Sequence, residues 1–404
     1  GGAASVARPG AARAGVTVIR LREAGPAQQL RLAADDARRL AASGIVDVRP
    51  GAASGMWSVR AGRQVGAARV GGLELHIEPK LPISRLLFLV GYVRDPKGWR
   101  DETVPLPEQA GLVPALAAAL WRQTDRALRA GLLQGYQTVD ETSPVLRGRL
   151  RETAQLSRWA GRSLPLEIRH DEYTVDIAEN RILASAADRM LRVPGIDAES
   201  RRALRHLAAR FAGVRRLPPG VPPPPWRPTR LNTRLRTALR LAELVLAGAA
   251  VEAGRGGVLA NAFLLDLWQV YEDFLCGALR PAIEVTYGGT LAFQARDHLD
   301  LGRRLDLRPD LMWRGRDGQV RAVVDAKYKT TTAVADAYQM LAYCTAYGLP
   351  RGHLIYAAGE HPPVRHTIRN TGIEIVCHAL DLALDPPALL TQVHTLADQI
   401  AVGE

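Results

Sequence analysis

The chain has 404 residues, a formal net charge of +12, 47% hydrophobic and 23% charged residues, which excludes a globally disordered chain. It contains no apolar run long enough for a transmembrane helix, so we expect no membrane contact. Three widely spaced cysteines without metal-ligand spacing (Cys276, Cys344 and Cys377) are typical of a reducing compartment, so we expect a cytoplasmic protein.

The N-terminal part of the chain is predicted to be β-rich. Residues 1–15 are rich in Ala, Gly and Arg and lack an apolar signal core, so we expect a disordered leader. Residues 16–100 carry short apolar runs separated by polar turns, with Gly71-Gly72 as a hairpin signal. They predict a β-rich N-terminal domain with one helix near Asp35–Ala42.

The rest of the chain divides at a proline cluster. Residues 101–217 predict a mixed, mainly helical middle region. Residues 218–230 contain too many prolines for a helix or a central strand and predict an extended connector. Residues 231–404 alternate helical and strand patterns and predict a C-terminal α/β domain with an Arg-rich leading helix. The expected fold class is therefore mixed α/β.

The positive charge is concentrated in residues 201–254, which are rich in arginine and contain only two acids. Arginines attract phosphate backbones and release their counterions, so this segment is a candidate contact for double-stranded DNA. The alternative is a solvated helix face without a ligand.

Two acids and a lysine stand on a predicted hairpin. Asp310 opens one apolar run, and Asp325 and Lys327 lie at the end of a second run after a glycine-containing turn. Residues two apart in a strand share a face, so Asp325 and Lys327 point the same way. If Asp310 meets that face, two carboxylates and an ammonium group converge. The alternative is a surface hairpin with solvated side chains.

The flanking segments add three polar candidates. Residues 261–279 have apolar residues at helical spacing and include Glu272, a possible third carboxylate or an exposed acid. Residues 333–348 predict another helix, on which Gln339 and Tyr343 share a face at i and i+4. These two side chains are candidates for holding DNA or ordered water, or form a partly buried polar pair.

Clustered carboxylates have a clear chemical use. Mg²⁺ (or Mn²⁺) prefers oxygen ligands, and one or two carboxylates with a phosphate oxygen are enough to hold it. We therefore predict a metal site at Asp310, Asp325 and Glu272. The chain has no phosphate-binding motif of the G-x-x-x-x-G-K-S/T type, so we expect it to bind no nucleotide itself.

In the order Glu272, Asp310, Asp325-x-Lys327 and Gln339-x-x-x-Tyr343, the chain resembles the PD-(D/E)xK nuclease superfamily. Further segments resemble the McrC family, whose members are nuclease subunits of McrBC systems that restrict DNA containing modified cytosine. These segments are Ile77–Leu81, Pro144–Leu150, Asp171–Asp176, Glu179–Leu183, Asp325–Lys329 and Tyr338–Tyr343.

The resemblance implies a Mg²⁺-dependent DNA endonuclease subunit of a type IV restriction system, active in antiviral defence. It implies a PD-(D/E)xK restriction-endonuclease-like α/β core within residues 231–404, with the metal at Asp310, Asp325 and Glu272, Lys327 orienting the attacking water, and Gln339 and Tyr343 in support. It also implies a partner, a McrB-like AAA+ GTPase ring that docks on the N-terminal half and recognises 5-methylcytosine.

Three other functions remain open on the sequence. The chain could be a non-nucleolytic DNA-binding activator of the AAA+ partner, although intact acidic and lysine positions count against this. It could be a stand-alone RecB-like nuclease, although the long N-terminal half counts against that. It could be an RNA nuclease, since these residues do not distinguish DNA from RNA.

Overall fold

The structure is a computed structural model that describes residues 16–94, 111–218, 220–249, 262–329, 334–357 and 363–402. The predicted leader, residues 1–15, lies outside this range. The chain forms two compact units: unit 1 comprises Gly1–Gly66, Leu75–Leu106 and Leu264–Glu404, and unit 2 comprises Ala67–Glu74 and Pro107–Phe263. In the described part of the chain, every helix is too short or too polar to cross a membrane. The fold is mixed α/β, as predicted.

The N-terminal segment is β-rich, as predicted. One sheet has the order β1-β6-β5-β10 and another the order β2-β4-β3. Gly71 adopts a positive φ of 59° between β5 and β6, which a residue without Cβ accepts readily. The elements are β1 (Thr17–Arg22), β2 (Gln28–Arg31), α1 (Ala34–Ser43), β3 (Val46–Pro50), β4 (Met56–Ala61), β5 (Gln64–Val70), β6 (Leu73–Glu78), α2 (Ile83–Arg94) and β10 (Ala262–Asp266).

A six-stranded mixed sheet forms the C-terminal part of unit 1, with the order β11-β14-β15-β16-β18-β17. The central strands β15, β16 and β18 are parallel and almost fully buried, as parallel strands usually are. The strands are β11 (Thr290–Phe293), β14 (Leu311–Arg314), β15 (Val320–Lys327), β16 (Arg351–Tyr356), β17 (Val364–Thr367) and β18 (Glu374–Ala379), and a separate pair is β12 (Asp297–His298) with β13 (Asp306–Leu307).

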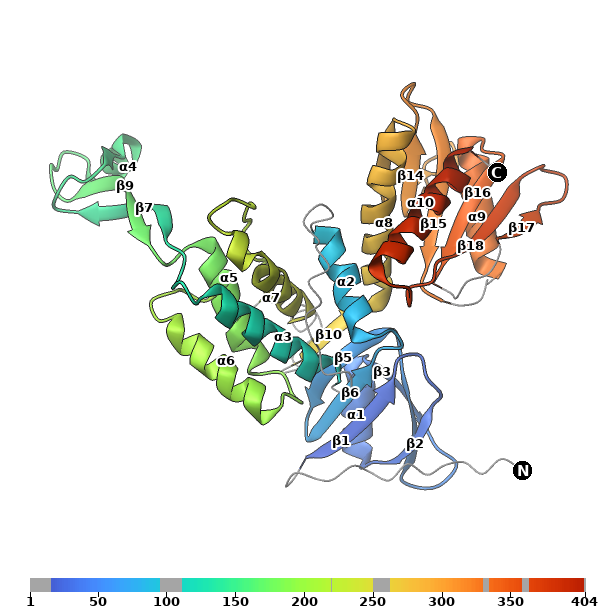
Figure 1. The fold of residues 1–404 in the computed structure, drawn as a ribbon, viewed down its shortest axis with the longest axis horizontal. Helices are drawn as coiled ribbons and strands as arrows, with labels where there is room; N and C mark the ends of the chain where they lie inside the picture. The colour runs from blue at the N-terminus through green and yellow to red at the C-terminus, as the bar shows by residue number, and fades with distance from the viewer. Residues whose placement is uncertain are drawn as a thin grey trace. The chain divides into compact units, whose positions relative to one another are not determined.

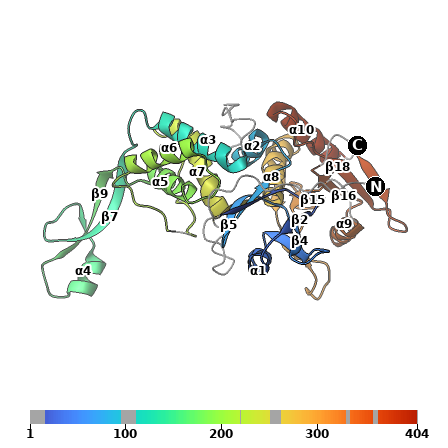
Figure 2. The same ribbon diagram turned by 90° about the horizontal axis from the view of Figure 1, so that it is seen from below.

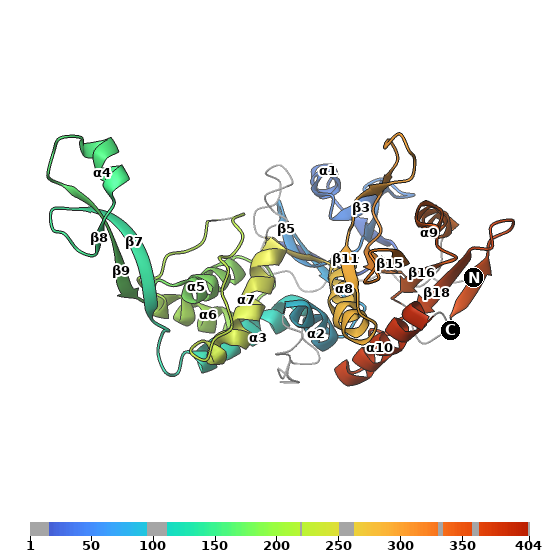
Figure 3. The ribbon, with the colours of Figure 1, turned by 90° about the horizontal axis from the view of Figure 1, so that it is seen from above.

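Helices cover both faces of this sheet (Figure 3). On one face α8 (Leu267–Thr286) and α10 (Pro386–Val402) share a core cluster with the sheet. On the other face α9 (Val334–Tyr347) packs through Met340, Tyr343 and Cys344.

Helix α2 packs against the C-terminal part of unit 1. Phe88, Leu89 and Tyr92 of α2 belong to the same core cluster as Tyr271 and Phe274 of α8. The Phe274 ring contacts Phe88 and Tyr92 edge-on, with centroid separations of 5.8 and 5.6 Å. Part of the predicted N-terminal domain therefore completes the core of the C-terminal sheet (Figure 1).

Unit 2 is mainly helical, with an arm of antiparallel strands. The helices are α3 (Leu112–Ala127), α4 (Glu152–Trp159), α5 (Ala178–Met190), α6 (Ala198–Arg210), η1 (Thr233–Leu235) and α7 (Arg236–Ala249). The arm consists of β7 (Gly135–Ser143), β8 (Arg149–Leu150) and β9 (Leu166–Thr174), and it carries α4 (Figure 2).

The segment Asp171–Leu183 holds unit 2 together. The Asp176 carboxylate binds the guanidinium groups of Arg181 and Arg215, and Arg181 holds its pKa below the usual range. The fully buried Asn180 amide donates to the carbonyl oxygens of Leu133 and Val175, both at 2.7 Å. These contacts give the segment a structural role.

Two predicted boundaries differ from the units. Helix α7, expected to lead the C-terminal domain, belongs to unit 2 and packs against α5 and α3. The predicted connector 218–230 also lies within unit 2, where the Trp226 indole donates to Glu243 Oε1 at 2.9 Å. It therefore does not join the two units.

The Arg-rich segment 201–254 is partly used for internal ion pairs. Arg210 pairs with Asp125, and Arg216 with Asp188. An arginine that pairs with a carboxylate attracts a phosphate backbone less strongly than an unpaired one. Several others are exposed: Arg202, Arg205, Arg227, Arg230 and Arg234.

Candidate active site

The predicted hairpin brings the two aspartates together. β14 and β15 pair antiparallel with Leu311 opposite Val324, so Asp310 lies beside Asp325 at the same end of the hairpin. Asp310 Oδ2 accepts a hydrogen bond of 2.7 Å from the backbone N–H of Ala326. The turn closes through Gly318, whose N–H donates to Gly315 O at 3.0 Å. The convergence expected from the sequence is therefore present.

These carboxyl groups are buried next to one another. Asp310 is 8% exposed, Asp325 1% and Glu272 2%. Burial, followed by the charge of Asp325, raises the pKa of Asp310 well above its usual range. Burial also raises the pKa of Glu272, opposed by its hydrogen bond to Gln294. Clustered buried carboxylates repel one another, and such an arrangement is typical of sites that bind a cation.

The raised pKa of Asp310 predicts how stability depends on pH. A carboxyl group with a raised folded-state pKa contributes stability below the unfolded pKa, about 4, and loses it as the pH rises through the folded value. Asp310→Asn removes the free-energy cost of ionising this buried carboxyl group at high pH, but it keeps an acceptor for the Ala326 amide. We expect the variant to be more stable than the wild type by about 1–3 kcal/mol near pH 8 without metal.

Thermal unfolding in EDTA at pH 5 and pH 8 tests this expectation. The gain in melting temperature should be clear at pH 8 and small at pH 5, because the wild-type carboxyl is largely protonated at the lower pH. An Asp310→Asn protein less stable than the wild type at both pH values would show that repulsion at Asp310 is not a significant cost.

Glu272 reaches the site from helix α8. The Asp266 side chain caps this helix by accepting from the N–H of Trp268 at 3.1 Å. Glu272 Oε1 accepts from Gln294 Nε2 at 2.5 Å, while Glu272 Oε2 is buried without a hydrogen-bond partner. Gln294 also contacts the Arg308 guanidinium.

Sequence reasoning missed Gln294 and Arg308. Gln294 has a positive φ of 44°, and its N–H donates to Asp310 O at 2.9 Å, so the loop after β11 is tied to the hairpin. A single glutamine in a loop carries no periodic signal. Arg308 stands two residues before Asp310 and was the available clue.

Lys327, Gln339 and Tyr343 form a chain of contacts. The Lys327 ammonium group contacts Asp325 Oδ2 and donates to Gln339 Oε1 at 3.1 Å. Gln339 Nε2 donates to the Tyr343 hydroxyl at 2.8 Å, and that hydroxyl donates to Arg308 O at 3.0 Å. Burial raises the pKa of Tyr343, so its hydroxyl remains a donor. These contacts fix the position of Lys327.

The donor set fits a hard divalent cation. Glu272 Oε2 is a buried carboxylate oxygen without a hydrogen-bond partner, and the buried Asp325 Oδ2 contacts the Lys327 ammonium group. Within the described residues, no three His, Cys, Asp or Glu side chains form a ready metal cage. Two carboxylate ligands completed by water and phosphate oxygens are what Mg²⁺ commonly uses.

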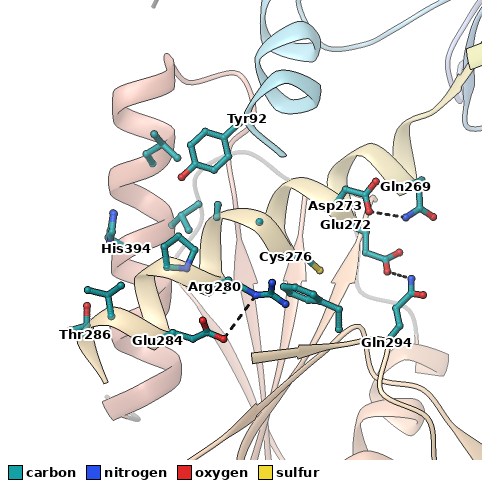
Figure 4. Close-up of a pocket in the computed structure, with 17 residues that line it drawn as sticks. Tyr92, Gln269, Glu272, Asp273, Cys276, Arg280, Glu284, Thr286, Gln294 and His394 are labelled. Atoms are coloured by element: carbon teal, nitrogen blue, oxygen red, sulfur yellow. Dashed lines mark hydrogen bonds and ion pairs between the residues drawn. The ribbon is translucent and has the colours of Figure 1, made fainter. Parts of the chain in front are cut away.

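A pocket of about 1130 Å³ lies beside Glu272, along α8 (Figure 4). Figure 4 shows Glu272 and Gln294 at one end and His394 on α10 at the other. Arg280 lies over the Phe293 ring at 3.9 Å from its centroid. Of the three candidate carboxylates, Glu272 lines this pocket.

A search of curated proteins found no match. A solved structure of Thermococcus gammatolerans, a refined half-complex from a tetradecameric assembly of McrB AAA+ hexamers with bound McrC, has a similar fold. It is 18% identical with a TM-score of 0.57, covering 95% of this chain and 100% of that chain.

A second structure, the cryo-EM structure of the Thermococcus gammatolerans McrBC complex, is 18% identical with a TM-score of 0.38 and covers 66% of this chain and 88% of that chain. A family model described as "McrBC 5-methylcytosine restriction system component" matches residues 59–357, which is most of the chain and includes every candidate site residue. The chain therefore belongs to the family of McrBC 5-methylcytosine restriction system components.

Proposed function

We propose that this chain is the Mg²⁺-dependent (or Mn²⁺-dependent) DNA endonuclease subunit of a modification-dependent restriction system, with a PD-(D/E)xK core. The observation that carries the proposal is the cluster of buried Asp310, Asp325 and Glu272 beside Lys327. Buried carboxylates side by side destabilise the fold unless a cation or hydrogen bonds compensate their charge. Family membership supports the same activity.

In this proposal Asp310, Asp325 and Glu272 hold the metal. The metal, when bound, would polarise the phosphodiester and lower the pKa of the attacking water. Lys327 would orient the attacking water or offset the charge that develops on the attacked phosphate. Gln339 and Tyr343 keep Lys327 in place, and Gln294 orients Glu272.

We propose a McrB-like AAA+ GTPase ring as the partner. The related structure from Thermococcus gammatolerans is described as McrB AAA+ hexamers with bound McrC. The sequence lacks a nucleotide-binding motif, so the energy for DNA translocation would come from another chain. The exposed arginines of residues 201–254 are candidate contacts to double-stranded DNA.

The test is cleavage of methylated and unmethylated plasmid by the chain with its AAA+ partner, with GTP or ATP, in Mg²⁺ or in EDTA. We expect cutting of methylated plasmid that requires the partner, the nucleotide and the metal. Faster nucleotide hydrolysis by the partner without any cutting would instead identify an activator. Cutting without the partner would identify a stand-alone nuclease.

A further inference from the structure

Glu23 is a buried carboxyl group far from the candidate site in sequence. It follows β1, is 2% exposed, and its N–H donates to Glu78 O at 2.9 Å. Glu23 Oε2 accepts from the backbone N–H of Lys80 at 3.0 Å and faces the Tyr328 hydroxyl at 3.4 Å. Burial raises the pKa of Glu23, while the Lys80 amide and the Tyr328 hydroxyl oppose that change. An apolar side chain would fill this position without the desolvation cost of a carboxyl group. The carboxyl group therefore points to a role other than packing.

Tyr328 connects Glu23 to two residues of the site. It directly follows Lys327, and its ring contacts the Tyr271 ring with a centroid separation of 5.9 Å. Tyr271 is fully buried, donates its hydroxyl to Ile355 O at 3.1 Å, and directly precedes Glu272. Tyr328 is therefore the chain neighbour of Lys327 and lies against the chain neighbour of Glu272.

The backbone at the end of β15 is held on its other side by β16. Lys327 O accepts from the N–H of Lys329 at 2.8 Å and from the N–H of Ala357 at 3.0 Å. The strand ends there, and the contacts of the Tyr328 side chain with Glu23 and Tyr271 act on the direction in which the chain leaves the sheet. A small rotation at this point would move the Lys327 ammonium away from Asp325 and Gln339.

We propose that Glu23 and Tyr328 are positioning residues of the nuclease site. Glu23, anchored on the Lys80 amide, fixes the Tyr328 hydroxyl, and Tyr328 in turn fixes the backbone that presents Lys327. This inference rests on the proposed nuclease function. It also gives the segment Ile77–Leu81 a role, because that segment supplies the amide that orients Glu23.

The test uses the full chain assembled with its AAA+ partner on methylated plasmid. Tyr328→Phe removes only the hydroxyl, and Glu23→Ala removes the acceptor. We expect each to lower kcat by about tenfold, since small misplacements of catalytic groups have large effects on rate. KM for DNA and the stimulation of the partner's nucleotide hydrolysis should stay within about twofold.

Three variants supply the controls. Glu23→Gln keeps a carbonyl acceptor for both donors and should restore most of the activity. Tyr92→Phe removes a hydroxyl from another tyrosine of the same core cluster and should cut at the wild-type rate. The double variant Glu23→Ala/Tyr328→Phe should be no slower than either single variant, because both break one contact.

The outcomes separate this inference from the proposed function. A wild-type complex that does not cut contradicts the proposed function itself. With an active wild type, the inference is overturned if Tyr328→Phe and Glu23→Ala cut normally, or if Glu23→Gln is as slow as Glu23→Ala. It is also overturned if the loss of rate follows a loss in melting temperature and disappears on cooling, because that is a folding defect.

Discussion

Asp325→Asn is expected to reduce DNA cleavage by the assembled complex by about a thousandfold or more. Asp325 is 1% exposed, and its Oδ2 contacts the Lys327 ammonium group, so the change removes the central anionic group of the site. Several kcal/mol of transition-state stabilisation correspond to this factor at about 1.4 kcal/mol per tenfold change in rate. Stimulation of the partner's nucleotide hydrolysis should persist.

A matched control exists on the same hairpin. Asp317 lies in the turn between β14 and β15, where it is half-exposed and pairs with Arg321. Asp317→Asn should therefore cut like the wild type. If Asp325→Asn retains more than about a tenth of wild-type activity under single-turnover conditions, these carboxylates do not hold the catalytic metal.

Lys327→Met is expected to lower the cleavage rate by about 10²- to 10⁴-fold with little change in DNA affinity. Methionine preserves the length and the packing of the side chain, so the loss reports the ammonium group. Gln339→Ala should produce a smaller loss, about tenfold, because Lys327 keeps its contact with Asp325 while losing the Gln339 acceptor.

Lys329 provides the comparison for this prediction. It stands two residues further along and pairs with Asp336 at 2.6 Å, outside the carboxylate cluster. Lys329→Met should cut at close to the wild-type rate. Equal losses from Lys327→Met and Lys329→Met would indicate a general requirement for positive charge at the end of β15, and would contradict a specific role for Lys327.

The local parts of the site could be predicted from the sequence. The hairpin and the i, i+4 relation of Gln339 and Tyr343 depend only on turn chemistry and periodicity, and both agree with the structure. The prediction of a helical pattern over residues 261–279, which include Glu272, was only partly right. Residues 262–266 form a strand, and α8 begins at Leu267, because a short apolar run does not distinguish a strand from a helix.

The non-local parts could not be predicted. The packing of Phe88 against Phe274 and the contact of Glu23 with Tyr328 join residues that are far apart in sequence. Composition alone made the Arg-rich segment a candidate contact for DNA. The count of arginines cannot show that Arg210 and Arg216 are occupied by carboxylates of their own unit.

The six-stranded sheet of unit 1 depends on chain segments that are not contiguous with it. Residues 264–404 supply the sheet, α8 and α10, but α2 fills the space next to Phe274 from residues 83–94. A fragment beginning at residue 264 would expose this aromatic surface to water, which favours aggregation. The part of this protein that carries the candidate site therefore cannot be transferred between genes as one continuous segment. A fusion or exchange of this part has to include the N-terminal strands and α2.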